Sequence, residues 1–597
     1  MRYLAVAHNE RVEGQTRARV LMNLGREDAL DAEGLRRLVA SINRYLGEEP
    51  APAGPGAAAG ELVITSSRAL GGAWLLDGLW RRLGVDAALE ELLGPRRYSS
   101  DVERVLFALT ANRALAPCSK LAATQWASLD AAIPGLEGFS DDQAYRAMDL
   151  LVEADAEAKV QEAVFFATAN LLNLEVDVLL FDTTSTYFER DRPDPDVPGP
   201  DEPAAVEPAA VAPGEPGAGR DEPGADAGGT AGAGGGGAAG FRRYGHSKDH
   251  RPDLPQIVIG LAVTKEGIPV RVWCWPGNTT DTSVLPQVRA GMRDWKLGRV
   301  ITVVDRGFSS NANLAELRRG GGHWIAGERM RDRSGDAVAA LSRQGRYTPV
   351  AENLHVKEAK LEDTPGVRWI VCLNPAEAVK DKTARDAAVE RAGAEIARIA
   401  AARTTTKTAL EAAADPKKRK RLEAELAGHA KAECVLRDHK ALGRWLRQTP
   451  EGRLALDKAK IAAEEKLDGK YLLSTSDPHL APGEAALAYK NLLKAERGFR
   501  DLKTGLLLRP VHHRLEHRIR AHVLICWLAL LLTRVAENAA GESWARIGSE
   551  MDRLAAITLT GPAGTLVQAT EPTDRQRAIL TACQVPPPPR ITSLAPR

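Results

Sequence analysis

Three acidic residues stand where the sequence predicts a shared cleft. Asp182 and Asp305 each follow a short apolar run of strand-forming residues, so each is expected at the C-terminal end of a strand. Glu496 is expected on a helix that begins at Pro482 and ends at Gly505. Taken singly, either aspartate is more simply explained as a strand-end or capping residue. Together with a helix glutamate, they form the carboxylate set that a two-metal phosphoryl-transfer site requires.

The glutamate helix also carries residues suited to bind phosphate. Tyr489, Glu496 and Lys503 are spaced by seven, about two helical turns, so they are expected in one stripe. Arg500 follows Glu496 by four positions and joins that face. Two Mg²⁺ ions, for which Mn²⁺ can substitute, are the expected cofactors, because hard cations prefer carboxylate oxygens. The cations on the helix would hold phosphates beside the scissile bond.

These motifs resemble those of a known family. The stretch YKNLLKAERGFRDLK is similar to the glutamate helix Tyr-x2-Arg-x3-Glu-x6-Lys of one group of DDE transposases from bacterial insertion sequences, with Leu492 where that group has Arg. The resemblance also covers FDTTS around Asp182, DRGF after Asp305, YGHSKDHRPDLPQIVIGL over 244–261 and PGNTTD over 276–281. The motifs keep the family's order from near the N-terminus to about residue 540.

The resemblance implies a ribonuclease-H-like catalytic core in which Asp182, Asp305 and Glu496 bind the metal ions. It also implies that Tyr489 and Lys503 on the glutamate helix contact DNA phosphate. Arg497 and Arg500 on the same helix are the candidates to replace the arginine absent at 492. The implied activity is cleavage at the ends of an insertion sequence, followed by transfer of the 3′ ends to target DNA. The implied partners are double-stranded DNA, both terminal inverted repeats and target, and a second copy of the chain. A nuclease without strand transfer, or an inactive DNA-binding derivative, is the alternative.

The predicted fold class is α/β, a mixed sheet flanked by helices, with a helical N-terminal domain and a largely helical insertion before the last catalytic helix. The expected domains follow in chain order: 1–60, a hairpin, helix and linker; 61–170, helical and DNA-binding; 171–330, the first part of the core; 331–480, the insertion domain; 481–540, the rest of the core; and 541–597, a C-terminal tail region.

Charge is distributed unevenly along the chain. The net charge is only +1, but residues 191–240 hold 10 acidic and 2 basic residues. That segment is rich in Pro and Gly, so we expect a disordered acidic insertion. The other 547 residues then carry +9, and 490–534 hold 10 basic against 3 acidic residues, a charge suited to DNA phosphates. The basic run 417–421 is expected on a long exposed helix, as a solvated face or as a contact to the DNA backbone.

Several features favour a structural explanation over a chemical one. Trp273, Trp275 and Trp324 could stack on a displaced base, but core positions are the simpler expectation. His513 and His517 share a helical spacing but lack the further ligands of a zinc site. The six cysteines form no CxxC pair, and neither a signal peptide nor a membrane-spanning run of about 20 apolar residues is evident. A reduced, cytoplasmic protein without a membrane partner is therefore expected, and the family resemblance implies a bacterial cell and a place near the nucleoid.

Overall fold

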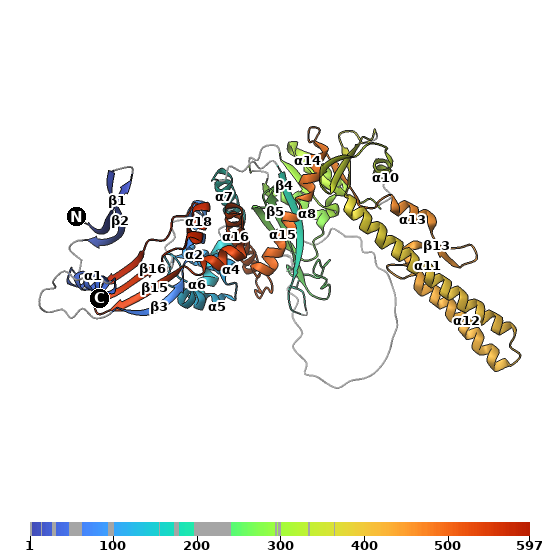
Figure 1. Cartoon of the computed structure of the whole chain (residues 1–597), viewed down its shortest axis with the longest axis horizontal. Helices are drawn as coiled ribbons and strands as arrows, with labels where there is room; N and C mark the ends of the chain where they lie inside the picture. The colour runs from blue at the N-terminus through green and yellow to red at the C-terminus, as the bar shows by residue number, and fades with distance from the viewer. Residues whose placement is uncertain are drawn as a thin grey trace, which may run out of the picture. The chain divides into compact units, whose positions relative to one another are not determined.

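Figure 1 shows the computed structural model of the protein. It divides into two compact units, of which the first comprises 1–298 with 493–597 and the second 299–492. The structure describes these residues: 3–12, 15–26, 32–46, 62–93, 101–153, 156–171, 178–190, 192–195, 240–292, 295, 300–331, 335–362 and 364–596. The predicted linker and nearly all of the acidic insertion lie outside them.

The first unit begins with the predicted hairpin and helix. Strands β1 (Tyr3–Val12) and β2 (Gln15–Arg26) pair antiparallel, and α1 (Ala32–Tyr45) follows. The turn expected at 13–14 lies outside the described residues.

A helical layer follows and is completed by a helix from far along the chain. In the described part of the chain, six α-helices follow α1 before residue 178: α2 (Gly71–Arg82), α3 (Val85–Leu93), α4 (Val102–Leu115), α5 (Lys120–Gln125), α6 (Asp141–Glu153) and α7 (Ala156–Leu171). Helix α16 (Glu516–Ala540) packs against α4 and α6. By length and composition α16 could cross a membrane, but 94% of its apolar window is buried within the protein. It is therefore placed as the core helix of a folded domain.

The C-terminal residues form a sheet that the sequence did not reveal. Its four strands, in spatial order, are β17 (Ile591–Pro596), β16 (Gly564–Ala569), β15 (Ala555–Gly561) and β3 (Val63–Ala69). Helices α17 (Trp544–Met551) and α18 (Asp574–Ala582) accompany it. The expectation that residues 66–170 contain no strand was therefore wrong at its start, since β3 pairs with β15 about 490 positions later and has no local hairpin signal.

Three antiparallel strands carry the first predicted site residue. Strand β4 (Val178–Tyr187) pairs with β5 (Gln256–Thr264), which pairs with β6 (Pro269–Pro276). Helix α8 (Asp281–Met292) follows β6. Asp182 lies in the middle of β4 rather than at its end, because polar Thr and Ser side chains after it continue the ladder. The expectation of a strand end at Asp182 was wrong.

The second unit contains a mixed sheet of six strands. Its order is β7 (Ile301–Val304), β8 (His323–Glu328), β14 (Lys470–Thr475), β11 (Arg368–Leu373), β10 (Leu354–Ala359) and β9 (Thr348–Ala351). The first pair is parallel and the others are antiparallel. Helices α9 (Asn311–Arg318), α10 (Gly335–Ser342) and α14 (Pro482–Lys490) belong to the same unit. The Ser310 hydroxyl caps α9 by accepting from the Asn313 amide.

A long helical hairpin extends from this sheet (Figure 1). Helix α11 (Pro375–Glu411) follows β11 directly, and α12 (Pro416–Arg437) returns along it. The remaining elements of the unit are short: β12 (Leu446–Gln448), β13 (Leu454–Leu456) and α13 (Lys458–Glu465). The long exposed helices expected over 376–440 are therefore present.

The glutamate helix is interrupted. Helix α14 ends in a two-residue turn at Asn491 and Leu492, α15 (Leu493–Arg500) begins immediately after, and a π-helical turn, η6, spans Asp501–Gly505. Leu492 is buried at this turn, with 5% of its surface exposed. One continuous helix with Tyr489, Glu496 and Lys503 in a single stripe was therefore a wrong prediction, because packing at the turn overrides the local helical preference.

Candidate active site

Asp182 lies on the face of β4 that the glutamate helix covers. Its partner in register on β5 is Leu261, and paired residues of neighbouring strands share a face. Helix α15 packs against both strands, and a Cβ added at Gly498 would come within 2.8 Å of Leu261 Cδ2. The glycine therefore permits a close approach of helix to sheet. The helix that carries Glu496 therefore packs on the Asp182 face, while Glu496 itself lies on the exposed side of the helix.

The exposed side of α15 carries an acid and a base without partners. Glu496 and Arg500 are both exposed, and no hydrogen bond or ion pair joins either side chain to another described residue. Arg497 differs, since its guanidinium lies 3.3 Å from Glu537 on α16. Arg500 is therefore the better placed of the two arginines to bind an external phosphate.

Lys503 is buried rather than facing solvent. Its ammonium donates to the Thr184 hydroxyl and to Asp249 Oδ1, each at 2.7 Å. Both members of the Lys503–Asp249 pair expose only 9% of their side chains, and Arg509 approaches the same carboxylate oxygen at 3.0 Å. Burial lowers the pKa of Lys503, and the hydrogen bond to Asp249 opposes that shift. In this arrangement Lys503 fixes the segment 244–251 against β4.

The opposite face of β4 holds a polar cluster that includes Lys248 of the motif HSKDHR and Asp281, a carboxylate that the sequence offered only as a weak candidate. Thr183 follows Asp182, so its side chain points to the other face of the strand. The Thr183 hydroxyl donates to Asp281 Oδ1 at 2.6 Å, and the Lys248 ammonium donates to that hydroxyl at 2.6 Å. Lys248 also pairs with Asp281 at 3.1 Å. The motif HSKDHR was the available signal, but only the fold shows that it bridges β4 and α8.

In the second unit, Asp305 directly follows β7, as predicted. The Tyr489 hydroxyl donates to Asp305 Oδ1 at 2.7 Å, and the Tyr489 ring stacks on Tyr471 with centroids 5.9 Å apart. A side chain at Gly327 on β8 would overlap the Tyr489 hydroxyl. This glycine therefore makes room for the contact that orients Asp305.

Electrostatics keep that hydroxyl protonated. Burial raises the pKa of Tyr489 far above its usual value, and the Asp305 carboxylate raises it further. Asp305 itself exposes 49% of its side chain, and Arg306 lies 4.0 Å from Oδ1. Tyr489 is therefore a permanent donor to one carboxylate oxygen of Asp305 at neutral pH.

The three predicted metal ligands are divided between the units. Asp182 and Glu496 belong to the first unit and Asp305 to the second. Within the part of the chain that the structure describes, no group of three or more His, Cys, Asp or Glu side chains lies close enough to hold a metal ion. The chemistry of the predicted donors nevertheless fits a hard divalent cation, since all three are carboxylates and Glu496 and Asp305 reach solvent.

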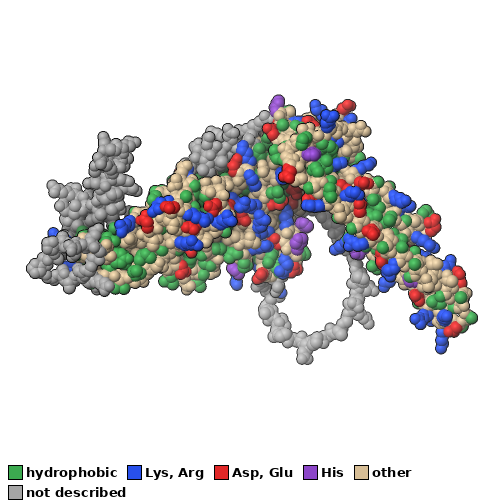
Figure 2. All heavy atoms as spheres, viewed as in Figure 1, with side chains coloured by type: hydrophobic (Ala, Val, Ile, Leu, Met, Phe, Trp, Pro, Cys, Tyr) green, Lys and Arg blue, Asp and Glu red, His purple; other side chains and the backbone are tan. Residues whose placement is uncertain are grey.

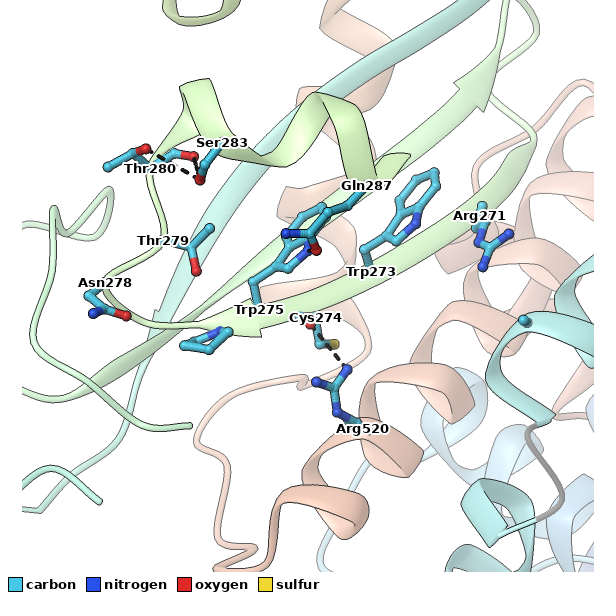
Figure 3. A pocket seen from close by; sticks show the side chains of 12 residues that line it. Arg271, Trp273, Cys274, Trp275, Asn278, Thr279, Thr280, Ser283, Gln287 and Arg520 are labelled. Carbon is cyan, nitrogen blue, oxygen red and sulfur yellow. Dashed lines mark hydrogen bonds between the residues drawn. The ribbon is translucent and has the colours of Figure 1, made fainter. Parts of the chain in front are cut away.

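Two of the three tryptophans, Trp273 and Trp275, line a pocket on the side of β4, β5 and β6 to which Thr183 points. Figure 3 shows Trp273 and Trp275 on β6 beside Gln287 of α8. The two indole rings are parallel, with centroids 6.3 Å apart, and Trp275 Nε1 donates to Gln287 at 2.7 Å. The pocket holds about 710 Å³, but Trp273 and Trp275 are 8% and 6% exposed, and Trp324 is 1% exposed. Core packing is therefore the better explanation for all three.

Among the described residues, no group of metal-binding side chains includes the histidine pair. His513 is half-buried, and burial lowers its pKa to about 3, with nearby cations adding to the shift. His517 instead lies 3.2 Å from Asp149. All six cysteines are free, which agrees with the expected absence of disulfides.

Comparison with known proteins assigns the family. The model of the transposase DDE domain matches residues 223–532, and that of the IS1634 family transposase N-terminal domain matches 1–54. A search of curated proteins gave no match. The chain is also similar to a solved structure titled as the piggyBac transposase synaptic complex with hairpin DNA, with 8% identity, coverage of 85% of this chain and 76% of that one, and a TM-score of 0.29, too low to support an argument. Because the DDE model spans more than half of the sequence, the chain belongs to the DDE transposase family and is a metal-dependent DNA transposase.

Proposed function

We propose that Asp182, Asp305 and Glu496 act together as one carboxylate site for phosphoryl transfer, in a core of the ribonuclease-H type. One observation carries the proposal: the helix with Glu496 packs on the face of β4 that bears Asp182, although 314 positions separate the two residues. Asp305 adds a carboxylate at the end of a parallel strand, held by Tyr489. Carboxylates from a strand interior, a strand end and a helix supply the oxygen ligands that this chemistry needs.

The three carboxylates would hold two Mg²⁺ ions, which Mn²⁺ can replace. When bound, such ions lower the charge on the phosphate oxygens and favour ionisation of the attacking hydroxyl. The Tyr489 hydroxyl donates to Asp305 Oδ1, so Oδ2 would remain to bind a metal ion. Glu496 is available because no described residue pairs with it.

The reaction then comprises two in-line displacements at phosphorus. In the first, a water oxygen bonds to phosphorus at the element's end and the 3′ oxygen leaves as a hydroxyl. In the second, that 3′ oxygen bonds to a target phosphorus and displaces the target's own 3′ oxygen. Each step exchanges one P–O bond for another, so no further energy source is required. Positioning and charge neutralisation supply most of the rate enhancement.

The chain's own cations would hold the DNA around this site. Arg500 is exposed and unpaired among the described residues, so it can bind a phosphate beside the scissile bond. The other candidates already have protein partners. Tyr489 donates to Asp305, Lys503 pairs with Asp249, and Arg497 pairs with Glu537. The regions 1–60 and 61–170 would recognise the terminal inverted repeats. Joining two ends requires two active sites, so a homodimer on DNA is expected, in the bacterial cytoplasm.

Strand transfer distinguishes this function from a nuclease with the same core. The test incubates the protein with Mg²⁺, a duplex carrying the element's end and a supercoiled target plasmid. We expect 3′ hydroxyl ends first and then end DNA joined covalently to the plasmid. Cleavage without any joined product would favour the nuclease. Binding of ends without cleavage would favour an inactive DNA-binding derivative.

A further inference from the structure

The outer end of the α11–α12 hairpin is a separate charged surface. Buried residues of α11 recur every seven positions, at Arg385, Ala392, Ile399 and Thr406, and Ile399 packs with Leu436 of α12 in one apolar cluster. Near the outer end, the Thr406 hydroxyl lies 3.0 Å from His429 on α12. At a rise of 1.5 Å per residue, the 37 residues of α11 extend about 55 Å from the end of β11. The hairpin is thus a long arm with a distant tip.

The tip, which we define as residues 407–421, is strongly basic. It holds six Lys or Arg and two acidic residues, and the run Lys417 to Arg421 is exposed throughout. No ion pair involves this run among the residues that the structure describes. Figure 2 shows Lys and Arg side chains gathered at the outer end of the hairpin.

Most cations along the rest of the arm are paired with acidic residues. The ion pairs described there include Lys380–Glu377, Lys382–Asp386, Arg398–Glu395 and Arg403–Glu433. An ordinary solvated helix surface interleaves opposite charges in this way. The tip departs from that pattern, so its charge is not explained by helix solubility.

The position of this basic run on α12 is electrostatically unfavourable. The run occupies the first turns of α12, where the helix dipole favours anions, and α12 has no acidic residue in its first turn. The Asp415 carboxylate caps the helix by accepting from the Lys417 amide at 3.1 Å, but it lies at the N-cap itself. Five consecutive residues at 100° each surround the axis instead of forming one stripe. Both the side chains and the helix end therefore attract an anion that approaches the tip.

We propose that this tip binds the phosphate backbone of double-stranded DNA, about one length of α11 away from the sheet of the second unit. The enzyme acts on DNA, and duplex DNA presents one negative charge per roughly 1.7 Å of its axis. The tip has no aromatic residue to stack on a base, and five cations spread around the helix suit phosphates on the DNA backbone better than base edges on one face. The contact is therefore independent of sequence.

The test compares two triple variants of the full-length protein without metal. The tip variant carries Lys417→Gln, Lys418→Gln and Lys420→Gln. The control carries Lys431→Gln, Lys440→Gln and Lys458→Gln, which remove the same charge from exposed and unpaired lysines elsewhere in the same unit. Circular dichroism should show both folded, because removing cations from a helix N-terminus does not weaken the helix.

Affinity for a long duplex of unrelated sequence is then measured over a range of salt concentrations. We expect the slope of log K against log salt to fall by about 2 to 3 for the tip variant, since each lost phosphate contact removes about 0.9. Its affinity at low salt should fall at least about tenfold relative to the control. Equal slopes and affinities for the two variants would overturn the proposal. Because no cleavage is measured, the outcome is independent of the catalytic assignment.

Discussion

Replacing Lys503 with Met tests whether this lysine serves the fold or touches DNA. The family resemblance implies a phosphate contact, whereas the structure buries the ammonium between Thr184 and Asp249. Removing one partner of a buried ion pair typically costs about 3–5 kcal/mol, because the other charge remains buried. Arg509 still approaches Asp249 at 3.0 Å, so we expect the lower end, about 3 kcal/mol.

The assay is amide hydrogen exchange in β4, which reports local opening of this strand. A loss of about 3 kcal/mol corresponds to exchange roughly a hundredfold faster. Asp249→Asn should also accelerate exchange, because it leaves the ammonium without its anion. The double variant should lose less than the sum of the two, with a coupling of about 2 kcal/mol.

Arg500→Met is the matched control, since Arg500 is an exposed cation on the neighbouring helix. It should leave exchange in β4 unchanged and weaken DNA binding. If Lys503→Met behaves like this control, with normal exchange and weakened binding, then Lys503 faces DNA and the assignment of a buried structural role is refuted.

Three further predictions concern other parts of the molecule. Gly327→Ala should displace the Tyr489 hydroxyl from Asp305 and cost about 1–3 kcal/mol on thermal unfolding, while slowing cleavage; unchanged cleavage would contradict the orienting role. Burial lowers the pKa of Lys120 from 10.5 to about 8, so the unfolded chain binds this proton more tightly than the folded chain. The free energy of unfolding should therefore rise by about 3 kcal/mol between pH 8 and 10.5. Denaturant unfolding of Lys120→Met should lack that rise, and a pH profile equal to that of the unchanged protein would contradict the assignment. Deleting the acidic residues 191–240 should tighten nonspecific DNA binding at low salt, and unchanged binding would show that they do not compete with DNA.

Local sequence patterns predicted the strands well where each was a continuous apolar run. Strand β7 follows this rule, since it is an apolar run that ends directly before Asp305, as expected. Asp182 is different, because the Thr and Ser side chains that follow it look like a turn but continue the ladder with β5. Strand β3 carried no signal at all, since its partner lies near the other end of the chain.

The site shows the same division between local and long-range information. Seven-residue spacing suggested a single stripe on one helix, yet the turn at Asn491 and Leu492 ends α14 there. Periodicity cannot reveal such a turn, because it depends on what the buried Leu492 packs against. Likewise, the residue type does not show whether a positive charge faces solvent, as that of Arg500 does, or a buried aspartate, as that of Lys503 does.

The shared carboxylate site is tested most directly by replacing its members one at a time. Asp182→Asn, Asp305→Asn and Glu496→Gln each remove a negative charge with little change in shape. With Mg²⁺ and a duplex carrying the element's end, we predict that each variant binds the DNA as the unchanged protein does and gives no detectable strand cleavage. Cleavage at the normal rate by any one of the three would contradict the account, because that carboxylate would then not belong to the site.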